Sequence, residues 1–587
     1  LTANTTAANN TAVGYASLGA NTTGTLNTAI GKDAGLSVTT GGQNTLIGAS
    51  SGDALTTGGN NVAIGISALS SDTTGGKSVA IGYAALFTQN QTGDVEPFNV
   101  AVGASAGLSV TTGVDNTLIG GLAGDANTTG SYNTAVGKSS LGANTTGVQN
   151  VAVGQASLDA NTTGNYNTGL GDNALSANTT ASSNTAIGQA SLFYNTTGAS
   201  NTAVGKSALT ANTTGTDNTA IGVNAMLSGT TASYNTAVGI NSLYSATTGT
   251  GVNTAIGRES MYTNTTGTRN TALGQSSLLN NTTASGNTAI GIESLFSNTT
   301  GFWNVAVGDK ALYTSTTAAN NTAVGQTALF AATTGGGNTG IGQAAGLAVT
   351  TGTNNTAVGH QALKATTTAT DNVSIGVNSL LVNTEGGNNV AIGRNALDAN
   401  TTASDNVAVG RDALSANTTG SSTTALGFEA GADNTTGANN LFLGHDAGRS
   451  GSPGGAITTA SNEICLGDEN IGAANIQVDW TVASDQRDKT DFTALDLGLD
   501  FVKALAPVTY KWDKRSKYGD NTADDYDLNN ITHDGTHKED WLDIGFKAQE
   551  VQALEEAAGY TTADKKNLTV STSEDGKQMG LQYSKFV

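Results

Sequence analysis

Three parts of the sequence hold side chains that could do chemistry. His533 and His537 lie four residues apart in "HDGTHKED", among several carboxylates, and this spacing suits metal ligands. Cys465 is the only cysteine of the chain. Ser484 precedes Lys489 by five residues in "SDQRDKTDF", and a serine hydroxyl becomes a nucleophile when a nearby base takes its proton. This spacing alone is weak evidence, because any serine followed by a lysine five residues later would match it.

The surroundings of the two histidines favour a solvated loop over a metal site. They belong to an acidic stretch, rich in Asn and Asp, that starts near Gly519. The run "DNTADDYD" at 520–527 lacks the central glycine of a calcium-binding loop. Cys465 falls at an apolar phase of the last repeat, which favours a small core residue over a reactive thiol. We therefore expect no metal and no cofactor.

The charge balance excludes nucleic acid as a partner. The chain has 24 basic and 45 acidic residues and a net charge of −21, and no cluster of Lys and Arg lies beside aromatic residues in the repeats. Binding to phosphates needs a cationic face. No apolar run approaches the roughly 18 residues that span a bilayer, so we also expect no membrane insertion in this segment.

A repeat of seventeen residues fills most of the chain. If the Asn of "NTAVG" is position 1, the repeats open at Asn10 and then every seventeen residues, with a longer step after Ser78 and one extra residue before Asn253. The last step reaches Asn462, which makes 27 turns. Position 4 is almost always Val, Ile or Leu, position 5 is Gly, and position 9 is mostly Leu or Met. Fixed apolar phases indicate a folded array of repeats.

The pattern predicts a mainly β fold, a parallel β-solenoid or β-roll. "TAVG" predicts a short strand that ends at the glycine, "SAL" a second strand, and "NTTG" a turn. We expect the Val or Ile of position 4 and the Leu of position 9 to form stacked columns inside the fold. We also expect the asparagines to bond in columns. With strands about 4.8 Å apart, 27 coils would measure roughly 130 Å.

Three coils depart from the pattern in the same way. In the coils that open at Asn27, Asn99 and Asn338, a glycine takes the usual leucine position and a valine replaces the asparagine of the turn. We expect the outline of the coil to change there.

The motif "NTAVG..SL..NTTG" resembles the head repeats of trimeric autotransporter adhesins and the shafts of bacteriophage tail fibres. The resemblance covers residues 1–468, and it implies that three chains build parallel β-rolls side by side as a homotrimer. The adhesin head unit is shorter than seventeen residues, which leaves the outline of the coil open.

The last part of the chain has a different character, because the period vanishes and tryptophans appear. Four segments together resemble the C-terminal intramolecular chaperone of endosialidase-type tail spikes and tail fibres. They are "SDQRDKTDF" (484–492), "LGLDFVKALAPVTYKW" (497–512), "IGFKAQEVQAL" (544–554) and "LQYSKFV" (581–587). We expect a shaft at 1–468, a connector at 469–483 and a small α+β chaperone domain at 484–587. The family pattern continues with a further helix, so we expect the natural domain to extend past Val587.

This second resemblance implies a role for Ser484 and Lys489. In that family the chaperone trimerises the fibre and then cuts itself off through a Ser and a Lys spaced as in "S-D-x-R-x-K". Lys489, with a pKa lowered by burial, would accept the proton of Ser484, whose hydroxyl would attack the preceding carbonyl. The bond cut would be Ala483–Ser484.

Taken together, the sequence predicts an extracellular structural fibre. The favoured interpretation is a homotrimeric phage tail fibre that attaches to a host surface, through a glycan or a surface protein, by length and multivalent contact. The shaft is not expected to be an enzyme, because its two larger insertions add only four or five residues, too few for a glycosidase site. The alternative is a bacterial trimeric surface adhesin or cell-surface filament.

Overall fold

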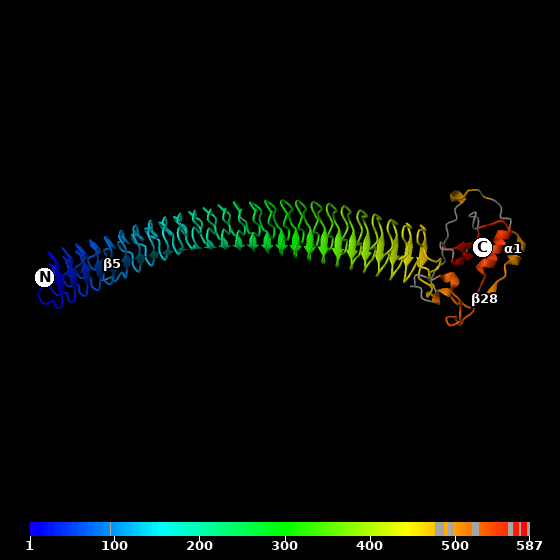
Figure 1. Ribbon diagram of the computed structural model, residues 1–587, viewed down its shortest axis with the longest axis horizontal. Coiled ribbons are helices and arrows are strands. Elements are labelled where there is room, and N and C mark those ends of the chain that lie inside the picture. The colour runs from blue at the N-terminus through cyan, green and yellow to red at the C-terminus, as the bar shows by residue number, and fades with distance from the viewer. Residues whose placement is uncertain are drawn as a thin grey trace. The chain divides into compact units, whose positions relative to one another are not determined.

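The computed structural model describes residues 1–93, 95–249, 251–472, 474–475, 486–490, 492, 497–518, 527–561, 568–573 and 577–583. The chain divides into two compact units, Leu1–Asn320 and Asn321–Val587. In each unit a short strand recurs once per coil, and the coils stack on one another (Figure 1). The second unit ends in a small α+β region.

Each coil contributes one strand of three residues. The strands of the first unit are β1 (Thr11–Val13), β2 (Thr28–Ile30), β3 (Thr45–Ile47), β4 (Val62–Ile64), β5 (Val79–Ile81), β6 (Val100–Val102), β7 (Thr117–Ile119), β8 (Thr134–Val136), β9 (Val151–Val153), β10 (Thr168–Leu170), β11 (Thr185–Ile187), β12 (Thr202–Val204), β13 (Thr219–Ile221), β14 (Thr236–Val238), β15 (Thr254–Ile256), β16 (Thr271–Leu273), β17 (Thr288–Ile290) and β18 (Val305–Val307). The coils of the second unit contribute β19 (Thr322–Val324), β20 (Thr339–Ile341), β21 (Thr356–Val358), β22 (Val373–Ile375), β23 (Val390–Ile392), β24 (Val407–Val409), β25 (Thr424–Leu426), β26 (Leu441–Leu443) and β27 (Ile464–Leu466).

Within each unit, every strand pairs in parallel with the strand of the next coil. Ala203 of β12, for example, lies opposite Ala220 of β13. Where the repeat is longer, as between β5 and β6, the extra residues leave the ladder and the strands stay in register, with Val79 opposite Val100. The predicted parallel β-solenoid of seventeen-residue coils is therefore confirmed.

The register of the last coil differs by one residue from the sequence pattern. The backbone N–H of Glu463, and not that of Asn462, donates to Asn440 Oδ1 over 2.8 Å, as the first residue of a coil does elsewhere. Glu463 is therefore position 1 of the coil that contains β27. Asn462 has φ of 67° and takes the position before it. The sequence pattern predicted Asn462 as position 1, because asparagine occupies position 1 in most other coils.

The predicted second strand at "SAL" is wrong. In the coil that opens at Asn201, Ser207 and Leu209 have φ of 58° and 53°, so the backbone turns sharply at both residues. An extended strand needs negative φ throughout. The bonds between coils persist without it, because the N–H of Leu209 donates to the carbonyl of Ala225 over 2.9 Å.

The core of each coil is lined by alanine, leucine and asparagine. Ala203 and Leu209 are fully buried, whereas Val204 is half-buried and Ile221 is 39 % exposed. In a strand of three residues the first and third side chains point to one face and the second to the other. The prediction that the Val and Ile columns lie inside the coil is thus wrong for a single chain. They form an outward face together with the preceding threonines.

Buried asparagines connect the coils, as predicted. The amide of Asn44 donates to Asn27 Oδ1 over 3.1 Å and to the carbonyl of Gly58 over 3.0 Å, and its backbone N–H donates to the same Asn27 oxygen. A second column lies in the "NTT" turn, where Asn144 donates to Asn127 Oδ1 over 2.9 Å. These bonds satisfy polar groups that would otherwise be buried without a partner.

Glycine at position 5 lets successive coils approach closely. Gly205 has φ of 134°, and a Cβ added there would lie 2.6 Å from the carbonyl carbon of Gly222 in the next coil. No side chain fits at that distance, so the invariant glycine in the repeat is a steric requirement of the stack.

The variant coils exchange large and small core residues. In most coils where position 9 is a glycine, the strand of the same or the next coil carries Leu or Phe in place of the usual alanine, as Leu118 does between Gly107 and Gly124. A Cβ on either glycine would lie 2.8 Å from a methyl carbon of Leu118. The coil that opens at Asn338 is an exception, because its strand carries Gly340 and the next strand Ala357. A Cβ on its Gly346 would instead lie 2.7 Å from a methyl carbon of Leu329 in the preceding coil. Gly35 keeps the left-handed φ of 59° that leucine has at this position elsewhere. The expected change of outline is therefore wrong, because the core compensates instead.

The C-terminal region is small and mixes helices with antiparallel strands. It contains 3-10 turns η1 (Gln486–Asp488), η2 (Arg515–Lys517) and η3 (Leu528–Asn530), helices α1 (Leu499–Ala504) and α2 (Ala548–Ala557), and strands β28 (Val508–Tyr510), β29 (Asp543–Gly545), β30 (Val570–Thr572) and β31 (Met579–Leu581). Strand β28 pairs with β29, and β30 pairs with β31. The carboxylate of Glu555, buried on α2, accepts the backbone N–H of Thr569 over 2.7 Å and so ties the helix to β30.

Candidate functional site

Of the two residues implicated in self-cleavage, the structure describes Lys489 but not Ser484. Ser484 and the preceding Ala483 lie outside the described residues. Lys489 follows η1, and its backbone N–H donates to the carbonyl of Gln486 over 3.2 Å. Its side chain is exposed in the single chain. The burial that we expected for Lys489 is therefore not provided by the described part of one chain.

The C-terminal region exposes many large apolar side chains. Helix α1 buries none of its residues, and its Leu499 is 65 % exposed. Ile544 of β29 is 78 % exposed, and Trp541 and Leu542 beside it are exposed as well. A folded domain rarely leaves so much apolar surface in water unless another molecule covers it. Such a surface is suited to contact with another molecule.

A hollow lined by aromatic residues lies between the two strand pairs of this region. Tyr510, Trp512, Phe546 and Tyr583 line it together with the side chain of Met579. The hydroxyl of Tyr583 accepts the backbone N–H of Phe546 over 3.2 Å, and Tyr510 meets Trp512 edge to face. Burial raises the pKa of Tyr510, and Tyr583 and Asp543 act in the same direction. The hollow suits an apolar contact better than acid–base chemistry.

The two histidines of "HDGTHKED" pack on one tyrosine. The ring of His533 lies parallel to that of Tyr518, and His537 meets the same ring edge to face with centroids 4.9 Å apart. The Tyr518 hydroxyl donates to Asp513 over 2.6 Å. Among the described residues, neither histidine belongs to a group of three side chains close enough to share a metal ion.

Cys465 is a core residue, as predicted. It is the middle residue of β27 and is 2 % exposed. The backbone N–H of Gly448 donates to its sulfur over 3.1 Å, and burial raises the pKa of the thiol. A buried thiol whose ionisation is disfavoured is a poor nucleophile.

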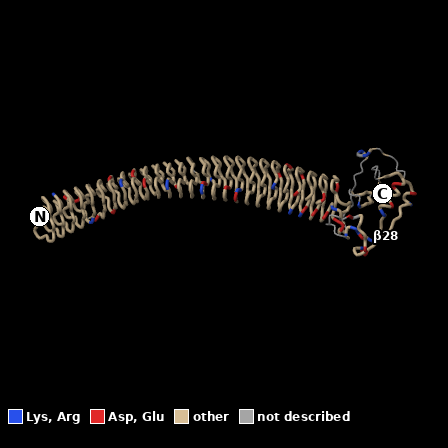
Figure 2. The backbone as a smooth tube through the Cα atoms, viewed as in Figure 1, with Lys and Arg blue, Asp and Glu red and all other residues tan. Residues whose placement is uncertain are grey.

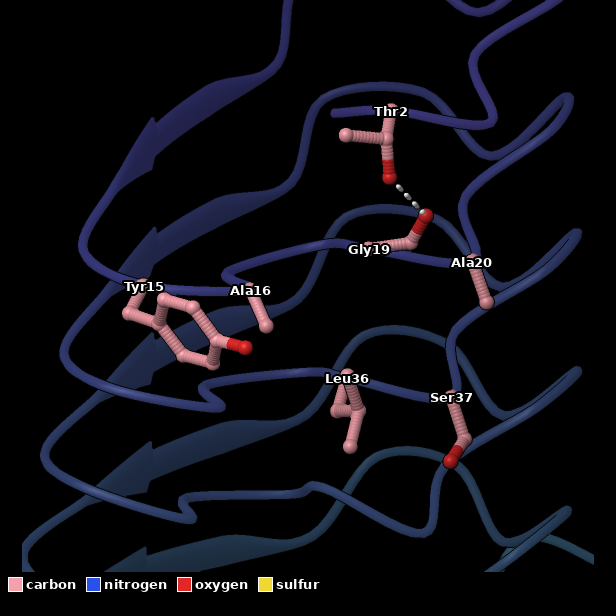
Figure 3. A pocket seen from close by; sticks show the side chains of 7 residues that line it. All are labelled: Thr2, Tyr15, Ala16, Gly19, Ala20, Leu36 and Ser37. Carbon is pink, nitrogen blue, oxygen red and sulfur yellow. Dashed lines mark hydrogen bonds between the residues drawn. The ribbon is translucent and has the colours of Figure 1, made fainter.

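One hollow of the first coils is lined by uncharged side chains. The hollow drawn in Figure 3 is lined by seven residues around Tyr15 and Leu36. Within it Thr2 donates to the carbonyl of Gly19 over 3.0 Å. None of the seven carries a carboxylate, imidazole, thiol or amine, and their only polar side chains are the hydroxyls of Thr2, Tyr15 and Ser37.

Comparison with known proteins assigns the C-terminal region. The family described as the chaperone of endosialidase, peptidase S74, matches residues 484–560. No curated protein matches the chain. The family is one of self-cleaving chaperones of phage tail fibres, and the match begins at Ser484 and includes Lys489. A β-solenoid followed by such a domain fits a tail-fibre-like structural protein.

The helices of the described residues are short. None of them has the length and hydrophobicity that crossing a bilayer requires.

Proposed function

We propose that this chain is one subunit of a homotrimeric phage tail fibre that contacts a host surface. The observation that carries the proposal is the chaperone-of-endosialidase match directly after a solenoid of repeated coils. Three identical shafts would present every surface feature three times, which raises avidity without strong single sites. A glycan or a surface protein of the host is the expected receptor.

Two exposed apolar surfaces support the trimer. One is the C-terminal region, with Ile544 and Leu499 in water. The other is the outward face of the strands, where Ile221 and its equivalents form a column along each unit. Sedimentation of an uncut variant should give a particle of three times the 58.3 kDa mass of the chain. A monomer at micromolar concentration would contradict the trimer.

For the cleavage we assign Ser484 as the nucleophile and Lys489 as the base. The Ser484 hydroxyl oxygen would attack the carbonyl carbon of Ala483 while its proton moves to Lys489 Nζ. The Ala483–Ser484 amide bond breaks, the serine amine leaves with a proton, and an ester joins the two residues. Water then hydrolyses this ester. Because Lys489 is exposed in one chain, its burial beside Ser484 would come from the neighbouring subunits.

Replacing the nucleophile tests this assignment. The wild-type chain should give two bands on a denaturing gel, and Ser484→Ala one uncut band, because no hydroxyl can attack. Lys489→Arg should also stay uncut, since a guanidinium keeps its proton. Ser516→Ala in η2 is the matched control and should cut normally. Two bands from Ser484→Ala would overturn the assignment and leave the fibre proposal standing.

The place of attachment needs a separate test. Electron microscopy of the native source should show the fibres on virions. Fibres on bacterial cells instead would favour the surface adhesin, which the resemblance of the repeat to adhesin heads keeps as a second candidate.

A further inference from the structure

Charged side chains gather on the last coils of the second unit, whereas they are sparse along most other coils (Figure 2). At position 6 of four successive coils, four side chains form one column. The guanidinium of Arg411 lies 4.3 Å from the ring centre of Phe428, and this ring stacks on the imidazole of His445 at 5.0 Å. His445 in turn faces Asp468 of the last coil. The imidazole is thus held between a ring and a carboxylate.

Three possible ligand atoms meet at this point. His445 Nδ1 lies 3.2 Å from Asp446 Oδ2 and 3.4 Å from Asp468 Oδ2, and all three atoms lie within 4.8 Å of one another. A tetrahedral ion with ligands at about 2.0–2.1 Å places neighbouring ligand atoms about 3.3–3.4 Å apart. Two of the three separations therefore already match, and no other such group occurs among the described residues.

The carboxylate of Asp468 is buried and oriented. Its side chain is 8 % exposed. The backbone N–H and the side-chain amide of Asn470 each donate to one of its oxygens over 2.9 Å. Metal sites commonly fix their ligands through such outer hydrogen bonds.

The surroundings carry more negative charge than their cations balance. Arg449, the nearest guanidinium, is shared among Glu429, Asp433 and Asp446. A divalent cation among these groups would relieve their mutual repulsion.

We propose that His445, Asp446 and Asp468 bind a divalent transition-metal ion. One imidazole and two carboxylates suit Zn²⁺, with the fourth position open to water. His445 and Asp446 belong to the coil of β26, and Asp468 to the coil of β27. The ion would therefore fasten the last coil to the coil before it, next to the connector that leads to Ser484.

Titration of Zn²⁺ into the full chain without a histidine tag tests the site. Calorimetry should show one ion per chain, and His445→Ala and Asp468→Asn should each weaken binding by at least about tenfold. His360→Ala is the matched control, because His360 occupies position 6 of its own coil, is exposed, and is followed by Gln361 in place of an aspartate. This control should bind as the wild type does, and so should the double variant His533→Ala, His537→Ala.

A second measurement reports where the ion acts. Backbone amide exchange of β27 should slow when Zn²⁺ is added to the wild type and should not change in Asp468→Asn, a variant of nearly the same shape. Absence of saturable Zn²⁺ binding by the wild type would overturn the proposal. Binding that survives in both His445→Ala and Asp468→Asn, or that is lost in the controls, would overturn it as well.

Discussion

Gly205 shows how a single atom limits this fold. Its backbone lies in a region that side chains rarely adopt, and the next coil passes within van der Waals contact of its Cα. Both constraints recur at position 5 of the other coils, so the sequence repeats glycine there while neighbouring positions vary.

We predict that Gly205→Ala destabilises its coil by about 2–4 kcal/mol, since it adds backbone strain and a backbone clash. Thermal unfolding and amide exchange around residues 201–222 would measure the effect. Gly121→Ala is the control, because a Cβ at Gly121 would meet only the carbonyl oxygen of Ala104 at 3.9 Å. Its effect should stay within about 0.5 kcal/mol. Equal effects of the two substitutions would contradict the steric explanation.

At the scale of the element, most coils balance their core volume between the strand and position 9. Alanine in the strand accompanies leucine at position 9, and Leu118 in the strand accompanies glycine at 107 and 124. The structure therefore explains why glycine replaces leucine at position 9 in some coils, which the sequence pattern alone did not explain.

This balance predicts a rescue. Leu118→Ala should destabilise the array by about 2–5 kcal/mol, because it leaves a cavity. Gly124→Leu alone should destabilise it by about 1–3 kcal/mol, because its side chain would overlap Leu118. In the double variant, the coil that opens at Asn116 again has alanine in the strand and leucine at position 9. Its loss of stability should therefore be smaller than the sum of the two single losses by more than about 1 kcal/mol. Denaturant unfolding of the wild type, the two single variants and the double variant gives the coupling free energy. If the two losses of stability simply add, the exchange of core volume between the strand and position 9 is refuted.

The sequence predicted the period, the parallel stacking and the asparagine columns, because these depend on residues that recur at fixed phases. It did not predict which face of the strand is buried. Hydrophobicity favours Val204 for the interior, but the narrow space opposite Leu209 accepts only Ala203. The turn at Ser207 and Leu209 was equally hidden, since neither residue type favours positive φ.

The candidate sites likewise contain residues that the sequence could identify and residues that only the structure brings together. Ser484 and Lys489 lie only five residues apart and match a family pattern, so they could be named in advance. His445 and Asp468 are brought together by the parallel pairing of β26 with β27, across coils of unequal length. No local sequence motif therefore predicts that they lie close together.

At the scale of the whole molecule, the exposed apolar side chains of the C-terminal region predict that assembly precedes cleavage. Lys489 is exposed in one chain, and the exposed Ile544 offers a surface on which other subunits could pack. A change that blocks assembly should therefore also block the cut.

Ile544→Asp tests this order. The side chain is 78 % exposed, so its loss should cost the single chain little stability, but a carboxylate in a subunit interface should prevent trimer formation. Sedimentation should show monomers, and a denaturing gel should show uncut chain. Thr532→Asp, which introduces the same charge at another exposed position, should assemble and cut normally. If Ile544→Asp is monomeric and is still cut, cleavage does not require assembly and the prediction is wrong.

The bonds between coils also determine how such a protein carries tension. At each junction the load is shared by several bonds at once, such as those from Thr202 to Asn218 and from Leu209 to Ala225. The junctions themselves follow one another in series. Adding coils therefore extends the reach of the chain without lowering the force at which it yields, which its weakest junction determines. An organism can lengthen such a tether by duplicating coils and lose no strength.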